Sequence, residues 1–503
     1  MREKYISWIA WSTLVFSIIY FFVVPLTGDA FVFISHAYIT ESKFGGGILN
    51  AARAWELKPI FNRVFFYILY HLSTMIVGDG DLLNLHIALK FFYLVFILGA
   101  AWGVVQVLEK SRKGKLIASH RFLLFSLSCA VLMLLPLADF FQCEYNAVIF
   151  CLIAAGILAH GQYRHKVILC ALSLLVIATG FKVLTVAIVF QTCILLVLVG
   201  ECPWRRALLI FFSTIVAFIL FIFLLYFVFP QEIYNFMLAP TLQKSNSVSV
   251  GAYLKIFRNV IRFFFHFRSG FGMVYVMPFI FLSVAIIIVD FFSNFKVYRT
   301  TLTIISLLSG IIAIVIQLHC FYYHYVFILI PIITGLCSVM YLQWSWKIIL
   351  GAAFFLIFPL IGLLLLNTPL QKWGPWPEKD VYHSWHSITE YDEQQEIKQI
   401  IPTNNNRKYT AFYFDDGTGV YLFRYQSACR FFYPLPLIRD ASGMPEYQEC
   451  LLALKSEPDF IVVQHTFLKK MSFFYPDYLK YYELAYKTQK HIVFKHKRLS
   501  RVD

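Results

Sequence analysis

Residues 6–31, ISWIAWSTLVFSIIYFFVVPLTGDAF, decide the fold class because they join a long apolar run to a carboxylate. The run 6–24 has about the 20 residues that a membrane-spanning helix needs. It follows the basic start Met1-Arg2-Glu3-Lys4, and no small-residue cleavage site ends it. We therefore expect an uncleaved first span with its N-terminus in the cytoplasm. A carboxylate just beyond such a span, here Asp29, is costly to hold unless something pairs with it or uses it.

The composition of the whole chain agrees with a polytopic membrane protein. Of the 503 residues, 59% are hydrophobic and 14% are charged, whereas a soluble globular protein has about 25% charged residues. The mean hydropathy is +0.69. The formal net charge of +15 fits basic cytoplasmic loops and attraction to anionic headgroups, so nucleic acid is not an expected partner. The ten cysteines show no metal-ligand spacing, but Cys429 and Cys450 lie in a polar tail and can form a disulfide if that tail is extracytoplasmic.

The basic loops set the predicted topology. Residues 109–121 contain five lysines and arginines and therefore belong in the cytoplasm. If the apolar segment 60–77 crossed the membrane, this loop would lie outside. We therefore expect 60–77 to form a juxtamembrane helix on the outer side, in agreement with its internal Arg63 and His71. The remaining apolar runs predict about eleven spans, at residues 6–24, 85–107, 122–137, 146–160, 167–181, 183–200, 207–229, 271–292, 301–318, 322–341 and 347–367.

The composition changes after Asn367, which predicts a membrane domain over residues 1–367 and an extracytoplasmic α/β domain over residues 368–503. Asp415-Asp416-Gly417 is typical of a turn between two strands. The predicted fold class is a polytopic α-helical membrane protein with about eleven transmembrane helices and outer juxtamembrane helices, followed by a small C-terminal α/β soluble domain. In that domain we expect strands at 409–414, 421–425, 460–463 and 491–494, and helices at 390–401 and 445–455.

Two charged residues border the predicted juxtamembrane helices. Asp29 can act as a general base that accepts the proton of an attacking hydroxyl, or it can cap the helix that follows. Lys58 can bind a phosphate oxygen, or it can extend to the lipid headgroups as an interfacial lysine. Glu56 and Arg63 are further candidates for substrate binding in the same stretch.

Further candidates share a place in the other predicted outer loops. Asp139 and Glu144 are alternatives for a second acidic catalytic group, and either can instead cap a polar loop. The remaining groups can bind the substrate, although lysines and aromatic residues also serve at the membrane interface. They are Lys182, Arg258, Arg262, His319, Tyr322 and Tyr323.

The order of these features resembles the GT-C superfamily of integral-membrane glycosyltransferases, and most closely the branch of lipid A aminoarabinose transferase and protein O-mannosyltransferases. The resemblance rests on Asp29 after the first span and on Lys58-Pro59 at the start of the outer juxtamembrane helix. It implies that Asp29 is catalytic and that Lys58 lies near the lipid phosphate. Two positions depart from the pattern: Ala30 stands where many relatives have Glu, and Leu57 separates Glu56 from Lys58.

The resemblance also implies the substrates and the compartment. The donor would be a polyprenyl-phosphate-linked sugar, and the acceptor an extracytoplasmic lipid, glycan or protein. The chain would lie in a bacterial inner membrane with its C-terminal domain in the periplasm. No nucleotide-binding motif is present, no cofactor is assigned, and a divalent metal stays open.

Three other functions stay open at this stage, and the least specific is a structural or receptor role, which a helical bundle of low charge with an outer domain permits. A transporter or flippase for a lipid-linked glycan would also need many spans and a cationic cavity, although no internal repeat is visible. A glycan polymerase or ligase would use the long loop 230–270, with Arg258, Arg262 and His266 as its working groups.

Overall fold

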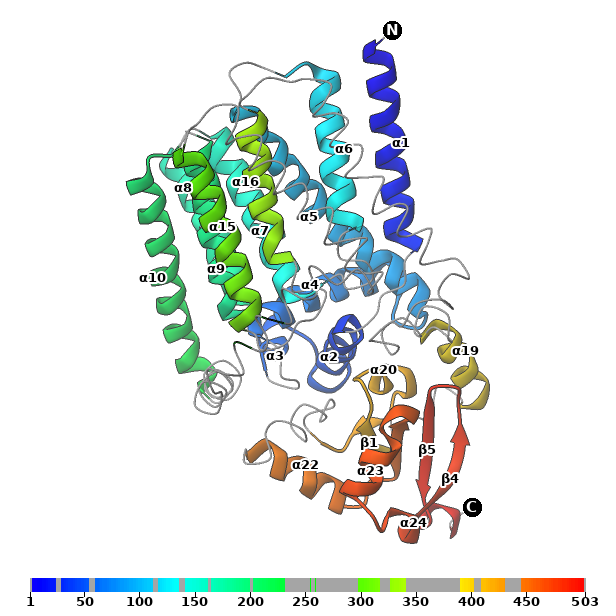
Figure 1. The fold of residues 1–503 in the computed structure, drawn as a ribbon. Helices are drawn as coiled ribbons and strands as arrows, with labels where there is room; N and C mark the ends of the chain where they lie inside the picture. The colour runs from blue at the N-terminus through cyan, green and yellow to red at the C-terminus, as the bar shows by residue number, and fades with distance from the viewer. Residues whose placement is uncertain are drawn as a thin grey trace. The chain divides into compact units, whose positions relative to one another are not determined.

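The computed structural model is mainly helical and carries one small sheet (Figure 1). Its contacts divide the chain into two compact units, Met1–Val24 with Lys90–Pro377 and Pro25–Leu89 with Glu378–Asp503. The second unit therefore groups residues 25–89 with the C-terminal domain. The residues that the structure describes are 2–23, 29–53, 59–111, 116–134, 141–161, 164–199, 202–230, 254, 258, 297–316, 326–340, 390–401, 409–429 and 445–501. The predicted boundary between residues 367 and 368 lies outside these ranges.

The first unit is a set of apolar helices. They are α1 (Arg2–Val23), α5 (Leu82–Lys110) from Lys90 onward, α6 (Ala118–Leu134), α7 (Cys143–His160), α8 (His165–Phe181), α9 (Val186–Leu198), α10 (Trp204–Val228), α15 (Val297–Ile316) and α16 (Leu329–Met340). Within the described ranges of the whole chain, five helical segments are long and apolar enough to cross a membrane: Glu3–Phe22, Ile60–Val77, Leu82–Lys110, Cys143–His160 and Trp204–Val228. The chain is thus a helical, membrane-associated protein.

Most predicted spans coincide with a helix of the structure. The spans at 146–160, 167–181 and 207–229 match α7, α8 and α10, because long apolar runs between polar loops leave few other assignments. The predicted spans 271–292 and 347–367 lie outside the described residues. The total of eleven spans therefore stays a prediction.

Two glycines let α5 and α7 pack unusually close together. A Cβ atom added at Gly103 would lie 2.1 Å from the carbonyl oxygen of Leu152, and one at Gly156 would lie 2.3 Å from the Cα atom of Gly103. Gly99 stands four residues before Gly103, which is the spacing of small residues that is common at helix contacts in membranes. This contact fixes α7, whose first turn carries Glu144.

The second unit combines three helices near the N-terminus with the C-terminal domain. The helices are α2 (Asp29–Phe44), α3 (Ile48–Ala51) and α4 (Ile60–Val77), and α2 packs on α4 through the rings of Phe33 and Phe66. The helix expected at 60–77 is confirmed with the same bounds. Its length and composition also suit a membrane span, so its juxtamembrane position stays a prediction.

The C-terminal domain is a five-stranded mixed sheet with helices, which confirms the α/β class. The strand order is β2-β1-β3-β5-β4, with parallel pairs β1–β2 and β1–β3 and antiparallel pairs β3–β5 and β5–β4. Its elements are α19 (Glu390–Ile400), β1 (Thr410–Phe414), α20 (Gly419–Phe423), β2 (Gln426–Ser427), α22 (Pro445–Lys455), β3 (Phe460–Gln464), α23 (Leu468–Phe474), α24 (Tyr478–Tyr481), β4 (Tyr482–Lys487) and β5 (His491–His496).

The strand predicted at 421–425 is wrong, because most of that stretch forms the helix α20. The cause is Asp415, whose carboxylate accepts the backbone N–H of Gly417 at 2.8 Å and that of Gly419 at 2.7 Å. This arrangement satisfies amide groups at the start of a helix, so the chain turns into helix directly after β1. The short apolar run that follows is compatible with a helix and with a strand, so the sequence pattern alone does not distinguish the two.

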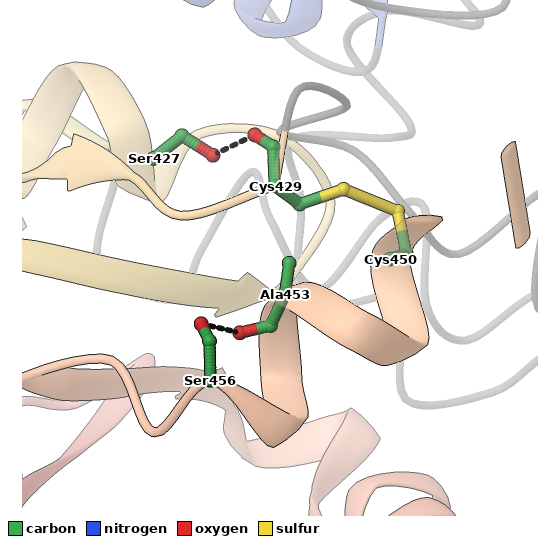
Figure 2. The surroundings of a disulfide bond; sticks show 5 residues. All are labelled: Ser427, Cys429, Cys450, Ala453 and Ser456. Atoms are coloured by element: carbon green, nitrogen blue, oxygen red, sulfur yellow. Dashed lines mark hydrogen bonds between the residues drawn. A yellow bond between two sulfur atoms is a disulfide. The ribbon is translucent and has the colours of Figure 1, made fainter. Parts of the chain in front are cut away.

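A disulfide joins Cys429 to Cys450, as Figure 2 shows. The two Cα atoms lie 5.3 Å apart, within the normal range for a disulfide, and both residues are buried. The bond ties the end of the β2 segment to α22 across 21 positions of sequence. The pairing predicted from the sequence is confirmed.

Candidate functional site

The structure describes four of the predicted site residues beyond their backbone. These are Arg63, Glu144, Lys182 and Arg258, the last of which is an exposed helical residue. Asp29 is the first residue of α2, and its side chain is not described. The others lie outside the described residues: Glu56, Lys58, Asp139, Arg262, His319, Tyr322 and Tyr323.

Glu144 and Lys182 form an ion pair in the first unit. Glu144 lies in the first turn of α7, where the helix dipole favours a negative charge. Its side chain is only 2% exposed, whereas that of Lys182 is 34% exposed. Lys182 Nζ donates a hydrogen bond to Glu144 Oε1. The structure thus brings together two residues that the sequence selected separately, and it leaves the lysine accessible to an anionic ligand.

Local backbone geometry aims Lys182 at the start of α7. Lys182 leaves α8 in an extended conformation, with φ −166° and ψ 138°. Thr185 then donates a hydrogen bond to the carbonyl oxygen of Ala178 at 2.7 Å, which fixes the tight connection to α9. The lysine is therefore held by a turn of defined shape, and its direction is set by more than the ion pair.

The chain is strained immediately before Glu144. Phe141 is fully buried and has φ +74°, a conformation that costs an aromatic residue about 1–3 kcal/mol. Asn146 compensates by donating to the Phe141 carbonyl oxygen at 3.1 Å, while the hydroxyl of Tyr93 donates to Asn146 Oδ1. Sequence reasoning missed Tyr93 and Asn146. The sequence feature that could have identified Asn146 is a polar amide side chain within an apolar run.

Lys90 is a second polar residue that sequence reasoning missed. It is fully buried in α5, and its Nζ donates to the carbonyl oxygen of Phe21 near the end of α1. Its Nζ atom also lies 5.0 Å from the centre of the Phe21 ring. A lysine side chain can satisfy one of the last carbonyl groups of a helix, which have no partner within the helix. Lys90 thus holds the end of α1, eight residues before Asp29 in the sequence.

Arg63 has a positioning role in the second unit. Its guanidinium Nη1 donates to the carbonyl oxygen of Arg53 at 2.5 Å, and His36 Nε2 donates to the same oxygen at 3.4 Å. Burial and then the charge of Arg63 lower the pKa of His36 to about 3, so this imidazole is neutral. The carbonyl of Arg53 directly precedes the stretch with Glu56 and Lys58, and the N-cap residue Pro59 ends that stretch. The carbonyl of Arg53 is therefore held by side chains of α2 and α4, and Pro59 is fixed as the N-cap of α4.

Glu41 provides a second link between α2 and α4. Its Oε1 accepts a hydrogen bond from the hydroxyl of Tyr67 at 2.8 Å and one from His71 Nδ1 at 2.7 Å. The same Tyr67 hydroxyl accepts the backbone N–H of Gly47 at 2.6 Å. Together these bonds hold the glycine-rich turn after α2 against α4.

A buried charge cluster organises the C-terminal domain around His491. His491 Nδ1 donates to Glu393 Oε1 at 2.7 Å, and its Nε2 lies 3.5 Å from Asp415 Oδ2. Burial by itself would lower the pKa of His491, but the charges of Glu393 and Asp415 raise it to about 10. The imidazolium in turn keeps the pKa of Glu393 low despite its burial. The cluster ties α19 to β5 and to the turn after β1.

The same helix α19 also holds the first residues of α5 within the second unit. Gln394 accepts the backbone N–H of Leu82 at 2.9 Å, and the hydroxyl of Tyr391 hydrogen-bonds with His86 Nδ1. Asp415 and Glu393 thus hold parts of the C-terminal domain together, through the turn after β1 and through His491.

No metal centre emerges from the described part of the chain, where no three or more His, Cys, Asp or Glu residues are grouped to hold an ion. Binding of a divalent metal therefore stays a prediction from the sequence that these residues do not test. Comparison of the sequence with models of protein families found no match, and comparison with curated proteins found none either.

Proposed function

We propose that this protein is an integral-membrane glycosyltransferase that transfers a sugar from a polyprenyl-phosphate donor to an extracytoplasmic acceptor. One observation carries the proposal: α2 and α4 pack together in the second unit, α2 begins at Asp29, and α4 begins directly after Lys58-Pro59 in the sequence. Arg63 and His36 hold the carbonyl oxygen of Arg53, five residues before Lys58 in the sequence, and this supports the proposal. A reactive group needs such a fixed support.

The proposed reaction is a direct displacement at the anomeric carbon. An acceptor hydroxyl oxygen forms a bond to that carbon while the bond to the phosphate oxygen breaks. Asp29 takes the hydroxyl proton, and polyprenyl phosphate leaves with the electron pair. The leaving group is an anion, so Lys58 stabilises it by charge, and displacement inverts the anomeric centre.

The disulfide supports the proposed compartment. Disulfides persist in secreted, periplasmic and cell-surface proteins and are rare in the cytosol. The bond between Cys429 and Cys450 therefore favours a C-terminal domain on the extracytoplasmic side of the inner membrane. That is the side on which a polyprenyl-phosphate sugar would be used by this enzyme.

The test of the proposed base uses the purified full-length chain, a polyprenyl-phosphate sugar and a hydroxyl acceptor. Asp29→Asn keeps the size and the helix-capping ability of the side chain but removes the proton-accepting charge. We expect transfer to fall by roughly 100-fold or more, the scale of a general-base contribution. The matched control is Asp477→Asn, whose side chain is 59% exposed in the C-terminal domain. A well-folded Asp29→Asn variant with parental turnover would remove Asp29 from the site.

The test of the phosphate-binding lysine uses the same assay. Lys58→Ala should weaken donor use more than Lys58→Arg, because arginine keeps the charge. One lost charge-assisted hydrogen bond corresponds to about 1.5–3 kcal/mol. The control Lys487→Ala removes an exposed lysine of β4. Equal, near-parental activity of both Lys58 variants would assign Lys58 to the headgroup interface instead.

A further inference from the structure

Arg424 connects the C-terminal domain to α2 within the second unit. It directly follows α20, which lies beside α2 (Figure 1). Its guanidinium carbon lies 4.3 Å from the centre of the Tyr38 ring of α2 and 4.2 Å from that of the Tyr421 ring of α20. A guanidinium is attracted to the faces of aromatic rings and stacks on them, so this contact ties the domain to α2.

The same guanidinium binds the turn that follows α4. Its Nη1 donates to Asp79 Oδ2 at 2.9 Å, and its Nη2 donates to the Asp79 carbonyl oxygen at 2.6 Å. The hydroxyl of Tyr421 donates to that carbonyl oxygen as well, at 2.6 Å. The side chain of Arg424 is only 14% exposed, and hydrogen bonds of a charged group are stronger where water is largely excluded. One side chain thus connects α2 with the end of α4.

The backbone of Arg424 has a conformation that favours glycine. Arg424 is the C-cap residue of α20, with φ +62° and ψ 8°. Glycine is the usual residue at a left-handed position after a helix, because a Cβ atom makes this conformation costly. Strained residues persist only where their surroundings hold them, and they cluster at functional sites. The contacts with Tyr38 and Asp79 are what the arginine side chain adds at this position.

The C-terminal domain supports Arg424 from both sides along the chain. Before it, Asp415 Oδ2 accepts the backbone N–H of Gly419 at 2.7 Å, at the start of α20. After it, the carbonyl oxygen of Tyr425 accepts a hydrogen bond from the hydroxyl of Tyr413 at 2.9 Å. Tyr413 belongs to β1, which pairs with β2 and β3. The guanidinium is therefore carried by a firmly held part of the domain, as a group that positions others must be.

The turn that contains Asp79 is also held at both of its ends. The backbone N–H of Gly78 donates to the carbonyl oxygen of Thr74 in α4 at 2.8 Å. The backbone N–H of Leu82, the first residue of α5, donates to Gln394 Oε1 of α19 at 2.9 Å. Because the turn continues α4 directly, a hold on Asp79 is a hold on the end of α4.

We infer that Arg424 is a positioning residue for the proposed transfer reaction, because it holds α2 in place relative to α4. α2 begins at Asp29, the proposed base, and α4 begins directly after Lys58-Pro59 in the sequence. Arg424 acts through Tyr38 and Asp79, so it has no part in bond formation or proton transfer. The effect on turnover rests on the proposed function, whereas the link between the two helices does not depend on it.

The first test measures the link by hydrogen exchange of the full-length chain in detergent. Arg424→Gly suits the backbone conformation and removes only the side chain. We expect the amides of α2 around Tyr38 and those of the turn after α4 to exchange about 10-fold faster or more, the effect of lost charge-assisted hydrogen bonds. The strands β1 and β3 should exchange as in the parent. The control Arg498→Gln removes an arginine that pairs with Asp459 inside the domain and should leave α2 unchanged.

The second test measures transfer by the same variants. The kcat of Arg424→Gly should fall about 10- to 100-fold, because a displacement of about 1 Å in a remote support can lower turnover 100-fold. The KM for the donor should change less than kcat, since alignment is lost and no substrate contact is removed. Arg424→Lys should resemble Arg424→Gly, because lysine lacks the planar fork that stacks and binds Asp79 at two atoms. Arg498→Gln should keep the parental kcat.

Further variants test the route of the effect. Tyr38→Leu removes the ring in α2, and the double variant Arg424→Gly/Tyr38→Leu should be no slower than Arg424→Gly alone if the arginine acts through this ring. Asp79→Asn weakens the link from the turn, and its side chain is 44% exposed, so it provides the measurement if Arg424→Gly does not fold. It should likewise speed exchange in the turn after α4 and lower kcat.

Parental exchange of α2 and of the turn in Arg424→Gly would overturn the inference, because the link would then be absent. Faster exchange with parental kcat would also overturn it, because Arg424 would then have a structural role only. Effects of Arg424→Gly and Tyr38→Leu on kcat that multiply independently would exclude action through the ring. The proposed function fails in a different way: a parent chain that transfers no sugar from any polyprenyl-phosphate donor loses the proposed enzyme and the role in turnover, while hydrogen exchange still decides the link.

Discussion

Removal of the disulfide should loosen one defined part of the C-terminal domain. In Cys450→Ser the segment after β2 loses its covalent link to α22, while the strands β1, β3 and β5 keep their pairing. A disulfide restricts the conformations of the unfolded chain. For a bond across 21 positions, the chain-entropy description gives a stabilisation of the folded state of about 3 kcal/mol. Since about 1.4 kcal/mol corresponds to a factor of ten, the open form should become about 100-fold more populated.

Hydrogen exchange of the full-length chain measures this change. We expect the protected amides of α22 to exchange about 100-fold faster in Cys450→Ser than in the parent, with little change in β5, because the lost constraint acts locally. The control Cys170→Ser replaces an exposed free cysteine of α8 and should leave exchange unchanged. Labelling of Cys429 and Cys450 as free thiols in native protein, or parental exchange in Cys450→Ser, would refute the reasoning.

Two further predictions concern charged groups. Glu144→Gln should destabilise the first unit by about 1–3 kcal/mol, the cost of leaving a partly buried polar group without its partner, because Lys182 loses the carboxylate. The double variant Glu144→Gln/Lys182→Met should recover part of this loss. Additive effects in a double-mutant cycle of thermal inactivation would show that the pair is uncoupled. The pKa of His491 is raised from 6.5 to about 10, so its stabilisation is complete below about pH 6.5 and is lost as the pH rises through about 10. The difference in melting temperature between the parent and His491→Gln should therefore shrink over that interval, and a constant difference would contradict the assigned charge.

The helical scaffold could be predicted because its signals are local. The span at 146–160 and the helices at 60–77 and 445–455 lie where apolar runs and helix-forming residues placed them. The disulfide could also be predicted, because only two cysteines lie in the polar tail. By contrast, 421–425 was assigned to a strand and β4 was missed, since short apolar or alternating segments suit more than one structure.

The sequence by itself determined that this protein is a helical membrane protein with a small α/β domain, because hydrophobic run length and charge count are properties of the chain alone. It also selected Glu144 and Lys182 as separate candidates. Only the tertiary structure paired them and placed Arg424 between two tyrosine rings. It also showed that Arg63 anchors a loop through a backbone carbonyl. Such contacts join residues far apart in the chain, so they depend on how helices and strands pack, which no local pattern encodes.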